Sequence, residues 1–137
     1  MQIRLATLDD HETIAALWEE SRLPTVALEE WDSLIASPSA MVILVEDEGA
    51  LAGAVVASFD GWRAYIYHIA VVPGRRHTGI ASMLIHEAES RLQALGARGI
   101  FTMVHEENTA GLALTARAGY ELQTGELVLA KGSATQP

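Results

Sequence analysis

A ten-residue loop between a strand pattern and a helix pattern constrains this chain most. Residues 64–71 (AYIYHIAV) are aromatic and β-branched, which is typical of a strand. After the loop at residues 72–81 (VPGRRHTGIA), hydrophobic residues recur at helical spacing until Gly96, a natural stop. The sequence therefore predicts a strand, a short glycine-containing loop and a helix of about four turns.

The charge at the start of this helix is unusual. Arg75, Arg76 and His77 lie where a helix carries partial positive charge, a place that disfavours basic residues. An anion bound between them would explain their presence. Gly79 and Ala81 would let a ligand approach the backbone closely, and the free N–H groups of a helix N-terminus bind phosphate. The alternative is a solvent-exposed basic turn without a ligand.

Two common phosphate motifs do not fit the loop. Gly74 and Gly79 have the spacing of a Walker A loop, but Ile80 and Ala81 stand where Lys and Ser/Thr are needed. No residue is then left to hold a γ-phosphate or a magnesium ion, which argues against a nucleotide hydrolase. The loop also lacks the G-x-G-x-x-G fingerprint of dinucleotide-binding proteins.

Composition narrows the class of protein. The length predicts a single domain at residues 1–131, followed by a disordered tail at 132–137. A net charge of −9 argues against a nucleic-acid partner. Without cysteine the chain has no disulfide, thiolate zinc site or cysteine nucleophile, and we expect no bound metal. No signal pattern or membrane-length apolar run is present, so a cytoplasmic protein without a membrane partner is expected.

The hydrophobic patterns predict the element order β-α-α-β-β-β-α-β-α-β-β. This is an α/β (α+β) fold with a mixed, mostly antiparallel central sheet of about six to seven strands flanked by four helices. Gly53, inside a predicted strand, indicates a bulge or close packing. The strands are expected at residues 3–5, 41–45, 51–59, 63–72, 100–104, 121–123 and 126–130.

Four motifs in order resemble those of the GNAT superfamily of N-acetyltransferases. Residues 76–81 (RHTGIA) match its acyl-CoA pyrophosphate loop, [R/Q]-x-x-G-x-[G/A]. Residues 3–10 resemble the usual start of the family, and residues 108–120 resemble its signature N-x-x-A-x-x-L-Y-x-x-x-G-[FY]. Residues 60–71 (DGWRAYIYHIAV) resemble the small stand-alone YpeA-like branch. The resemblance covers nearly the whole chain and implies the GNAT fold.

The resemblance implies an acetyl-CoA-dependent N-acetyltransferase. In this family a primary amine, of a small molecule or a protein, attacks the thioester directly in a ternary complex. The N–H near Val71 would stabilise the developing oxyanion. Asn108 would fix the far arm of the co-substrate or the local geometry. The implied acetyl-CoA contacts are Ile69, Ala70 and Val71 for the pantetheine, and Arg76, His77, Thr78, Gly79, Ile80, Ala81 and Ser82 for the pyrophosphate.

The chain departs from the family at two positions. Thr115 stands where many relatives have a tyrosine acid, and Met103 where many have a glutamate base. The local catalytic candidates are His68 and Tyr67, with residues 105–107 (HEE) less favoured. Because neighbours in a strand face opposite sides, only one of His68 and Tyr67 reaches the cleft unless a bulge intervenes.

These departures leave a second function open. A GNAT-fold acyl-CoA sensor or interaction module that has lost catalysis would also keep the loop, and Thr115 and Met103 at the usual tyrosine and glutamate positions motivate this alternative. The sequence does not specify the acceptor, the acyl-chain length or the general acid and base. Oligomeric state is open too, with a homodimer through edge strands or helices as one option.

Overall fold

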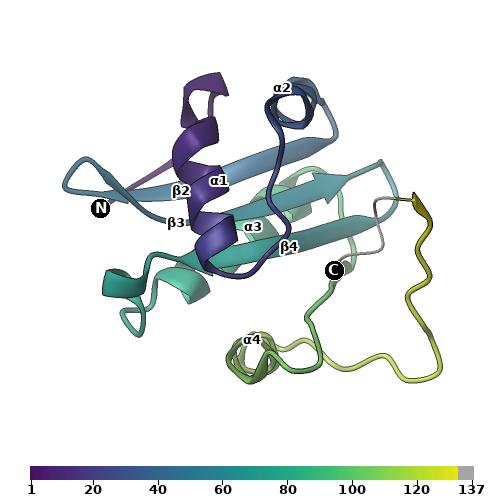
Figure 1. The fold of residues 1–137 in the computed structure, drawn as a ribbon. Coiled ribbons are helices and arrows are strands. Elements are labelled where there is room, and N and C mark those ends of the chain that lie inside the picture. Colours follow the sequence, from purple (N-terminus) through teal and green to yellow (C-terminus); the bar gives the residue numbers. More distant parts are fainter. Residues whose placement is uncertain (133–137) are drawn as a thin grey trace. The chain divides into compact units, whose positions relative to one another are not determined.

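The computed structural model describes residues 1–132, which form two units, residues 1–103 and the chain from Val104 onward. The first unit is built around one five-stranded sheet with the strand order β1-β2-β3-β4-β5 (Figure 1). Its elements are β1 (Gln2–Leu5), α1 (His11–Glu20), α2 (Leu28–Ala36), β2 (Ala40–Asp47), β3 (Ala50–Phe59), β4 (Ala64–Val71), α3 (Ile80–Ala94) and β5 (Ile100–Thr102).

The sheet is mixed and mostly antiparallel, as the sequence predicts. Strands β1 to β4 pair antiparallel in sequence order. Strand β5 returns through α3 and pairs parallel with β4, with Ala64 opposite Ile100 and Ile66 opposite Thr102. Parallel neighbours need such a crossover because the chain must travel back along the sheet.

Two hydrophobic layers cover the sheet. Ile14 and Trp18 of α1 and Trp31 of α2 pack with alternate residues of the central strands, such as Leu44 and Val56. Residues between them point to the other face, because strand side chains alternate. Helix α3 covers that face with a fully apolar stripe, and Figure 1 shows α1 and α3 on opposite sides of the strands. The buried residues of the stripe are Ile80, Leu84, Ile85, Ala88 and Leu92.

Arg4 explains the motif at the start of the chain. Its guanidinium holds Asp10 through two hydrogen bonds of 2.8 and 2.9 Å, and its Nε donates to Glu46 at 2.7 Å. Asp10 also accepts the backbone N–H of Thr7 at 2.7 Å. The hydrogen bonds from Arg4 hold the pKa of Asp10 below its usual value. This group therefore ties β1, the start of α1 and the end of β2 together.

Gly53 lies both at a bulge and at a site of close packing, the two alternatives that the sequence indicates. The β2–β3 register shifts beside it, since Val45 faces Gly53 while Glu46 faces Leu51. A Cβ at Gly53 would lie 2.9 Å from the Ala70 carbonyl oxygen and 3.1 Å from side-chain atoms of Ile80 and Leu84. Glycine is therefore required for β3 to approach both β4 and α3.

The predicted terminal hairpin is wrong. Residues 121–123 and 126–130 form no strands, although the turn at Thr124–Gly125 is present. Leu127 and Leu129 are 86% and 90% exposed, so this segment has no packed face to support pairing. Two short arms without a third strand or a packed face are at best marginally stable. The described chain consequently has five strands instead of six or seven.

The second unit contains α4 (Thr109–Arg117). Asn108 caps this helix by accepting the backbone N–H of Gly111 at 2.9 Å. Gly119, at φ 96°, ends it in the left-handed conformation expected after a helix. A single domain over residues 1–131 stays a prediction. The predicted tail at 132–137 lies, apart from Gly132, outside the described residues.

We predict that Gly53→Ala lowers the free energy of unfolding by about 1–3 kcal/mol, because its methyl group overpacks against backbone. Gly74→Ala is the matched control, since a Cβ there meets nothing within 4 Å. Urea unfolding monitored by circular dichroism measures the free energy of unfolding of both variants. Equal stability of the two variants would contradict the close-packing role of Gly53.

Candidate active site

Strand β4 carries a bulge at the centre of the site. Ala54 of β3 faces Ala70 and Val56 faces Tyr67, so two steps along β3 match three along β4. His68 lies within the longer stretch and has a left-handed backbone at φ 54°. The extra residue changes the alternation of side chains. Tyr67 and Ala70 consequently both face the layer formed by α1 and α2.

The bulge also turns His68 toward α1. The His68 ring packs edge-on against Trp18, with 4.9 Å between centroids, and lies 5.4 Å from the ring of Tyr67. Its Nε2 lies 3.0 Å from the carbonyl oxygen of Pro24. Since a carbonyl only accepts, Nε2 carries the proton and Nδ1 keeps its lone pair in the neutral ring. The bulge therefore brings both catalytic candidates to one side of the sheet.

Burial shifts the ionisation of both residues. Desolvation lowers the pKa of His68, and the hydrogen bond to the Pro24 carbonyl offsets part of this effect. Desolvation raises the pKa of Tyr67. At neutral pH His68 is consequently an unprotonated imidazole and Tyr67 a protonated phenol. These are the forms that a base and a proton donor require.

Beyond the bulge, β4 and β5 no longer pair. The ladder between them ends at Ile66 and Thr102. The last five residues of β4, 67–71, therefore have no partner on their β5 side within residues 1–103. Ile69, Ala70 and Val71 lie in this stretch. An extended ligand can use such free backbone groups as a neighbouring strand would.

The loop after β4 leads directly into an uncapped helix. A short 3-10 turn, η2 (Pro73–Arg75), follows the strand, and Gly79 precedes α3 with φ 86°. No side chain caps α3, so the N–H groups of Ile80, Ala81 and Ser82 remain available. The first helical bond runs from the N–H of Met83 to the Gly79 carbonyl at 3.0 Å. Three aligned donors at a helix N-terminus form an anion site.

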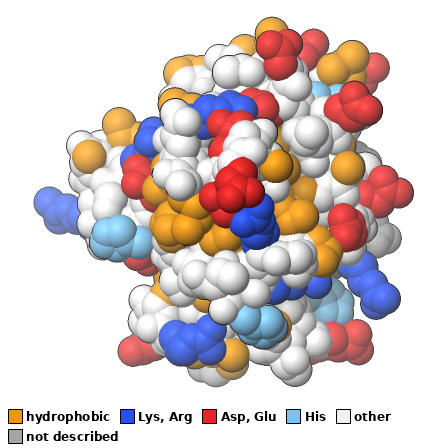
Figure 2. Space-filling model, turned by 90° about the vertical axis from the view of Figure 1, so that its left-hand side faces the viewer, with side chains coloured by type: hydrophobic (Ala, Val, Ile, Leu, Met, Phe, Trp, Pro, Cys, Tyr) orange, Lys and Arg blue, Asp and Glu red, His pale blue; other side chains and the backbone are white. Residues whose placement is uncertain are grey.

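The basic side chains of this loop do not form one cluster. Arg75 forms an ion pair with Asp47 at the end of β2, and the Arg76 Nε donates to the Val71 carbonyl at 3.2 Å. His77 is exposed, and the Thr78 hydroxyl donates to the Arg75 carbonyl. Figure 2, which faces this end of the sheet, shows basic side chains scattered among acidic and hydrophobic ones. The backbone is therefore the main source of free donors.

Comparison with known proteins identifies the family. Residues 5–120 match the family model of the acetyltransferase (GNAT) family. The chain belongs to the GNAT acetyltransferase family. It is 32% identical to an acetyltransferase of Sodalis glossinidius, covering 96% of this chain and 94% of the relative. It is 33% identical to an acetyltransferase of Pectobacterium atrosepticum, covering 88% of each chain.

Solved GNAT structures share the fold at low identity. The apo aminoglycoside 6′-N-acetyltransferase of Acinetobacter haemolyticus superposes with a TM-score of 0.80 at 19% identity, covering 96% of this chain and 99% of the other. A ribosomal-protein-alanine N-acetyltransferase of Brucella melitensis gives a TM-score of 0.79 at 19% identity, covering 95% and 98%. The resemblance stated from the loop and the element order is thereby confirmed at the level of family and fold.

The second GNAT signature is occupied by structural contacts in this chain. The Asn108 side chain is used as the cap of α4, and a Cβ at Gly111 would lie 2.6 Å from its Nδ2. Thr115, at the usual tyrosine position, is 6% exposed. Its hydroxyl lies 3.0 Å from the Gly111 carbonyl and 3.2 Å from that of Leu112. With its proton directed at these carbonyls, Thr115 does not replace the tyrosine acid.

Sequence reasoning missed two partners in the site. The Pro24 carbonyl orients His68 from 44 residues away, and Asp47 holds Arg75 from 28 residues away. A backbone carbonyl has no sequence signal, and Asp47 lies between the strands predicted at residues 41–45 and 51–59, where the sequence indicates no partner. Both contacts arise only when the α1–α2 connection and the end of β2 are brought beside β4 and its loop.

Two further properties concern the described part of the chain only. Within residues 1–132, no group of three His, Asp or Glu residues is placed to hold a metal ion. In the same residues, every helix is too short or too polar to cross a membrane.

We predict that the free energy of unfolding decreases as pH falls below about 6.5, because the unfolded chain then binds a proton at His68 that the folded chain resists. The stabilisation is present above the unfolded pKa and is lost as pH falls toward the lower folded pKa. Asn tolerates a left-handed backbone, so His68→Asn should flatten this slope between pH 5 and 8. An unchanged slope in urea titrations of the variant would contradict the buried, neutral state of His68.

Proposed function

We propose that this protein transfers an acetyl group from acetyl-CoA to a primary amine by direct attack in a ternary complex. The β4 bulge carries the proposal. It places Tyr67 and His68 together beside the unpaired end of β4, immediately before the uncapped N-terminus of α3. The similarity of the fold to an aminoglycoside 6′-N-acetyltransferase and a ribosomal-protein-alanine N-acetyltransferase supports an amine as the acceptor.

The chain fits acetyl-CoA in two places. The free N–H groups at the start of α3, with the loop from Arg76 to Gly79, are suited to the pyrophosphate. The free edge of β4 at residues 69–71 is suited to the amide-containing pantetheine arm. Asn108 would contribute indirectly, by holding the first turn of α4. Acetyl-CoA supplies an activated acetyl thioester whose thiol, with a pKa near 8.5, is a tolerable leaving group.

His68 is the proposed base. An ammonium substrate must lose a proton before its nitrogen can bond to the acetyl carbon, and the Nδ1 lone pair of His68 would accept that proton. The Pro24 carbonyl holds the ring through Nε2, which fixes the tautomer and leaves Nδ1 as the acceptor. The contact with Trp18 restrains the ring further.

Tyr67 is the proposed proton donor. As the carbon–sulfur bond breaks, the departing sulfur takes up negative charge and then a proton. The raised pKa of Tyr67 keeps its phenol protonated, so that it donates a hydrogen bond toward that charge. In this scheme Tyr67 is the proton donor, a role that the family resemblance would give to a tyrosine where this chain has Thr115.

We predict that His68→Asn lowers kcat by about 10²–10⁴-fold at pH 7. In the unmodified protein the rate should fall at acidic pH because His68 becomes protonated. The remaining activity of the variant should not show this fall. Thiol release from acetyl-CoA across a panel of primary amines measures both. Thr115→Val is the matched control and should keep activity, because its hydroxyl serves only the α4 backbone.

Other outcomes of this assay are equally informative. A Thr115→Val variant as impaired as His68→Asn would contradict these roles. Acetyl-CoA binding without transfer to any amine of the panel would instead favour the acyl-CoA sensor.

For acetyl-CoA binding, we predict at least about tenfold weaker affinity in Ala81→Glu, because the added carboxylate repels the pyrophosphate. The same carboxylate stabilises the helix N-terminus, so the variant should unfold at the same temperature or higher. His86→Glu places the same charge on an exposed position further along α3 and serves as control. Isothermal titration calorimetry measures the acetyl-CoA affinity of the unmodified protein and of both variants. Equal affinity in both variants would exclude the loop as the pyrophosphate site.

A further inference from the structure

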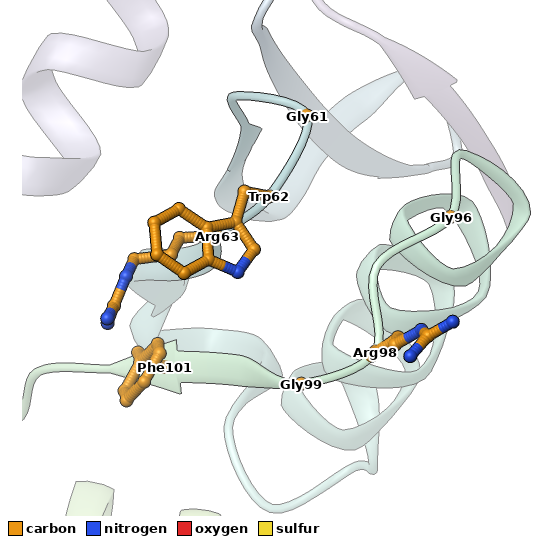
Figure 3. A pocket seen from close by; sticks show the side chains of 7 residues that line it. All are labelled: Gly61, Trp62, Arg63, Gly96, Arg98, Gly99 and Phe101. Atoms are coloured by element: carbon orange, nitrogen blue, oxygen red, sulfur yellow. The ribbon is translucent and has the colours of Figure 1, made fainter.

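A hollow lies at the opposite end of β4 from the proposed acyl-CoA loop at residues 72–81. It has a volume of about 370 Å³ and is lined by the turn before β4, the α3–β5 connection and Phe101 of β5 (Figure 3). All of its residues belong to the first unit. Since the acyl-CoA loop begins after Val71, roughly 23 Å of strand separates the two places. The proposed acetyl transfer does not use this hollow.

One wall of the hollow is an aromatic and cationic stack. The Arg63 guanidinium carbon lies 5.1 Å from the Trp62 ring centroid and 5.5 Å from that of Phe101. Asp60 fixes this turn by accepting the backbone N–H groups of Trp62 at 2.8 Å and Arg63 at 2.7 Å. Trp62 is nevertheless 78% exposed. A large, exposed indole held in place by a rigid turn is a ready stacking surface.

The charge of the hollow is opposite to that of the chain. Two arginines, Arg63 and Arg98, line it, and no Asp or Glu does. Within residues 1–132, neither guanidinium has a carboxylate at ion-pair distance, whereas Arg4, Arg75 and Arg91 all do. In a chain of net charge −9, two arginines without an ion pair at one hollow favour an anionic ligand, although the charge of Arg63 also acts on the nearby Asp60 carboxylate.

The remaining wall is bare backbone. A Cβ built at Gly61, Gly96 or Gly99 meets no atom within 4 Å, so added side chains would point into free space. Gly61 and Gly96 have positive φ values of 98° and 109°, whereas Gly99 does not. Alanine at position 99 is therefore compatible with the backbone and would narrow the hollow without strain.

We infer that this hollow binds a small planar aromatic ring carrying a carboxylate. The Arg63 guanidinium lies over one face of the Trp62 indole and draws π density toward that face. The ligand ring stacks on the opposite face of the indole, which is open. The carboxylate pairs with a guanidinium, which matches its planar, two-oxygen geometry. Figure 3 shows the Arg63 and Arg98 side chains pointing in different directions, so a single anionic group meets one of them. This geometry suits a monoanion.

Indole N–H signals in ¹H–¹⁵N spectra test this inference. The chain has three tryptophans, and Trp62→Phe identifies the signal of Trp62 by its loss. Indole-3-acetate should shift only the Trp62 signal, in a saturable way. Neutral indole-3-ethanol and non-aromatic cyclohexylacetate should bind at least about tenfold more weakly. Saturating acetyl-CoA should leave the titration unchanged, which separates this site from the acyl-CoA loop.

Three variants complete the experiment. Gly99→Ala should weaken indole-3-acetate binding because the added methyl group narrows the hollow. Arg63→Gln should weaken the same binding because it removes the cation. Arg117→Gln, with the same charge change on α4, should bind as the unmodified protein does. An unshifted Trp62 signal would overturn the inference and leave the arginine stack as a purely structural contact. Equal shifts by all three probes, or by indole-3-acetate in all three variants, would also overturn it.

Discussion

The bulge in β4 is the feature on which the rest of the site depends. Without the extra residue at His68, Tyr67 and His68 would face opposite sides of the sheet. A left-handed backbone at a histidine is unfavourable unless its surroundings support it. Here the Pro24 carbonyl and the Trp18 ring provide that support. The same irregularity lies where the β4–β5 ladder has just ended, so the proposed catalytic side chains and the free backbone groups occur together.

Much of this arrangement could be predicted from the sequence because it depends on local patterns. The strand at residues 64–71, the glycine-containing loop after it and the helix that follows each have a local sequence signal, and the structure confirms all three. The bulge could not be predicted from the sequence, because no residue type at or near His68 marks a positive φ. The sequence shows only that a bulge is needed if Tyr67 and His68 are to lie on the same side of the sheet. The prediction of a terminal hairpin was wrong because a short apolar run such as residues 127–130 forms a strand only where other strands or a packed face support it.

Charge proved a poorer guide than backbone geometry. Three adjacent basic residues suggested a cationic cluster, yet Arg75 is paired with Asp47 and Arg76 folds back onto Val71. The donors that remain free at the loop are main-chain N–H groups at the start of α3. At position 115, where the family signature has a tyrosine, the Thr115 hydroxyl is directed at the α4 backbone. Position alone does not carry a catalytic role from one GNAT protein to another.

The central claim is that acetyl-CoA lies along the free end of β4 with its pyrophosphate on the start of α3. Backbone amide shifts on addition of acetyl-CoA and of CoA test it most directly. Both should move the amides of residues 69–71 and 77–82, because both carry the pantetheine arm and the pyrophosphate, and acetyl-CoA should add a further shift at residues 68–71. A folded protein that binds acetyl-CoA while the amides of residues 77–82 stay unmoved would contradict the claim.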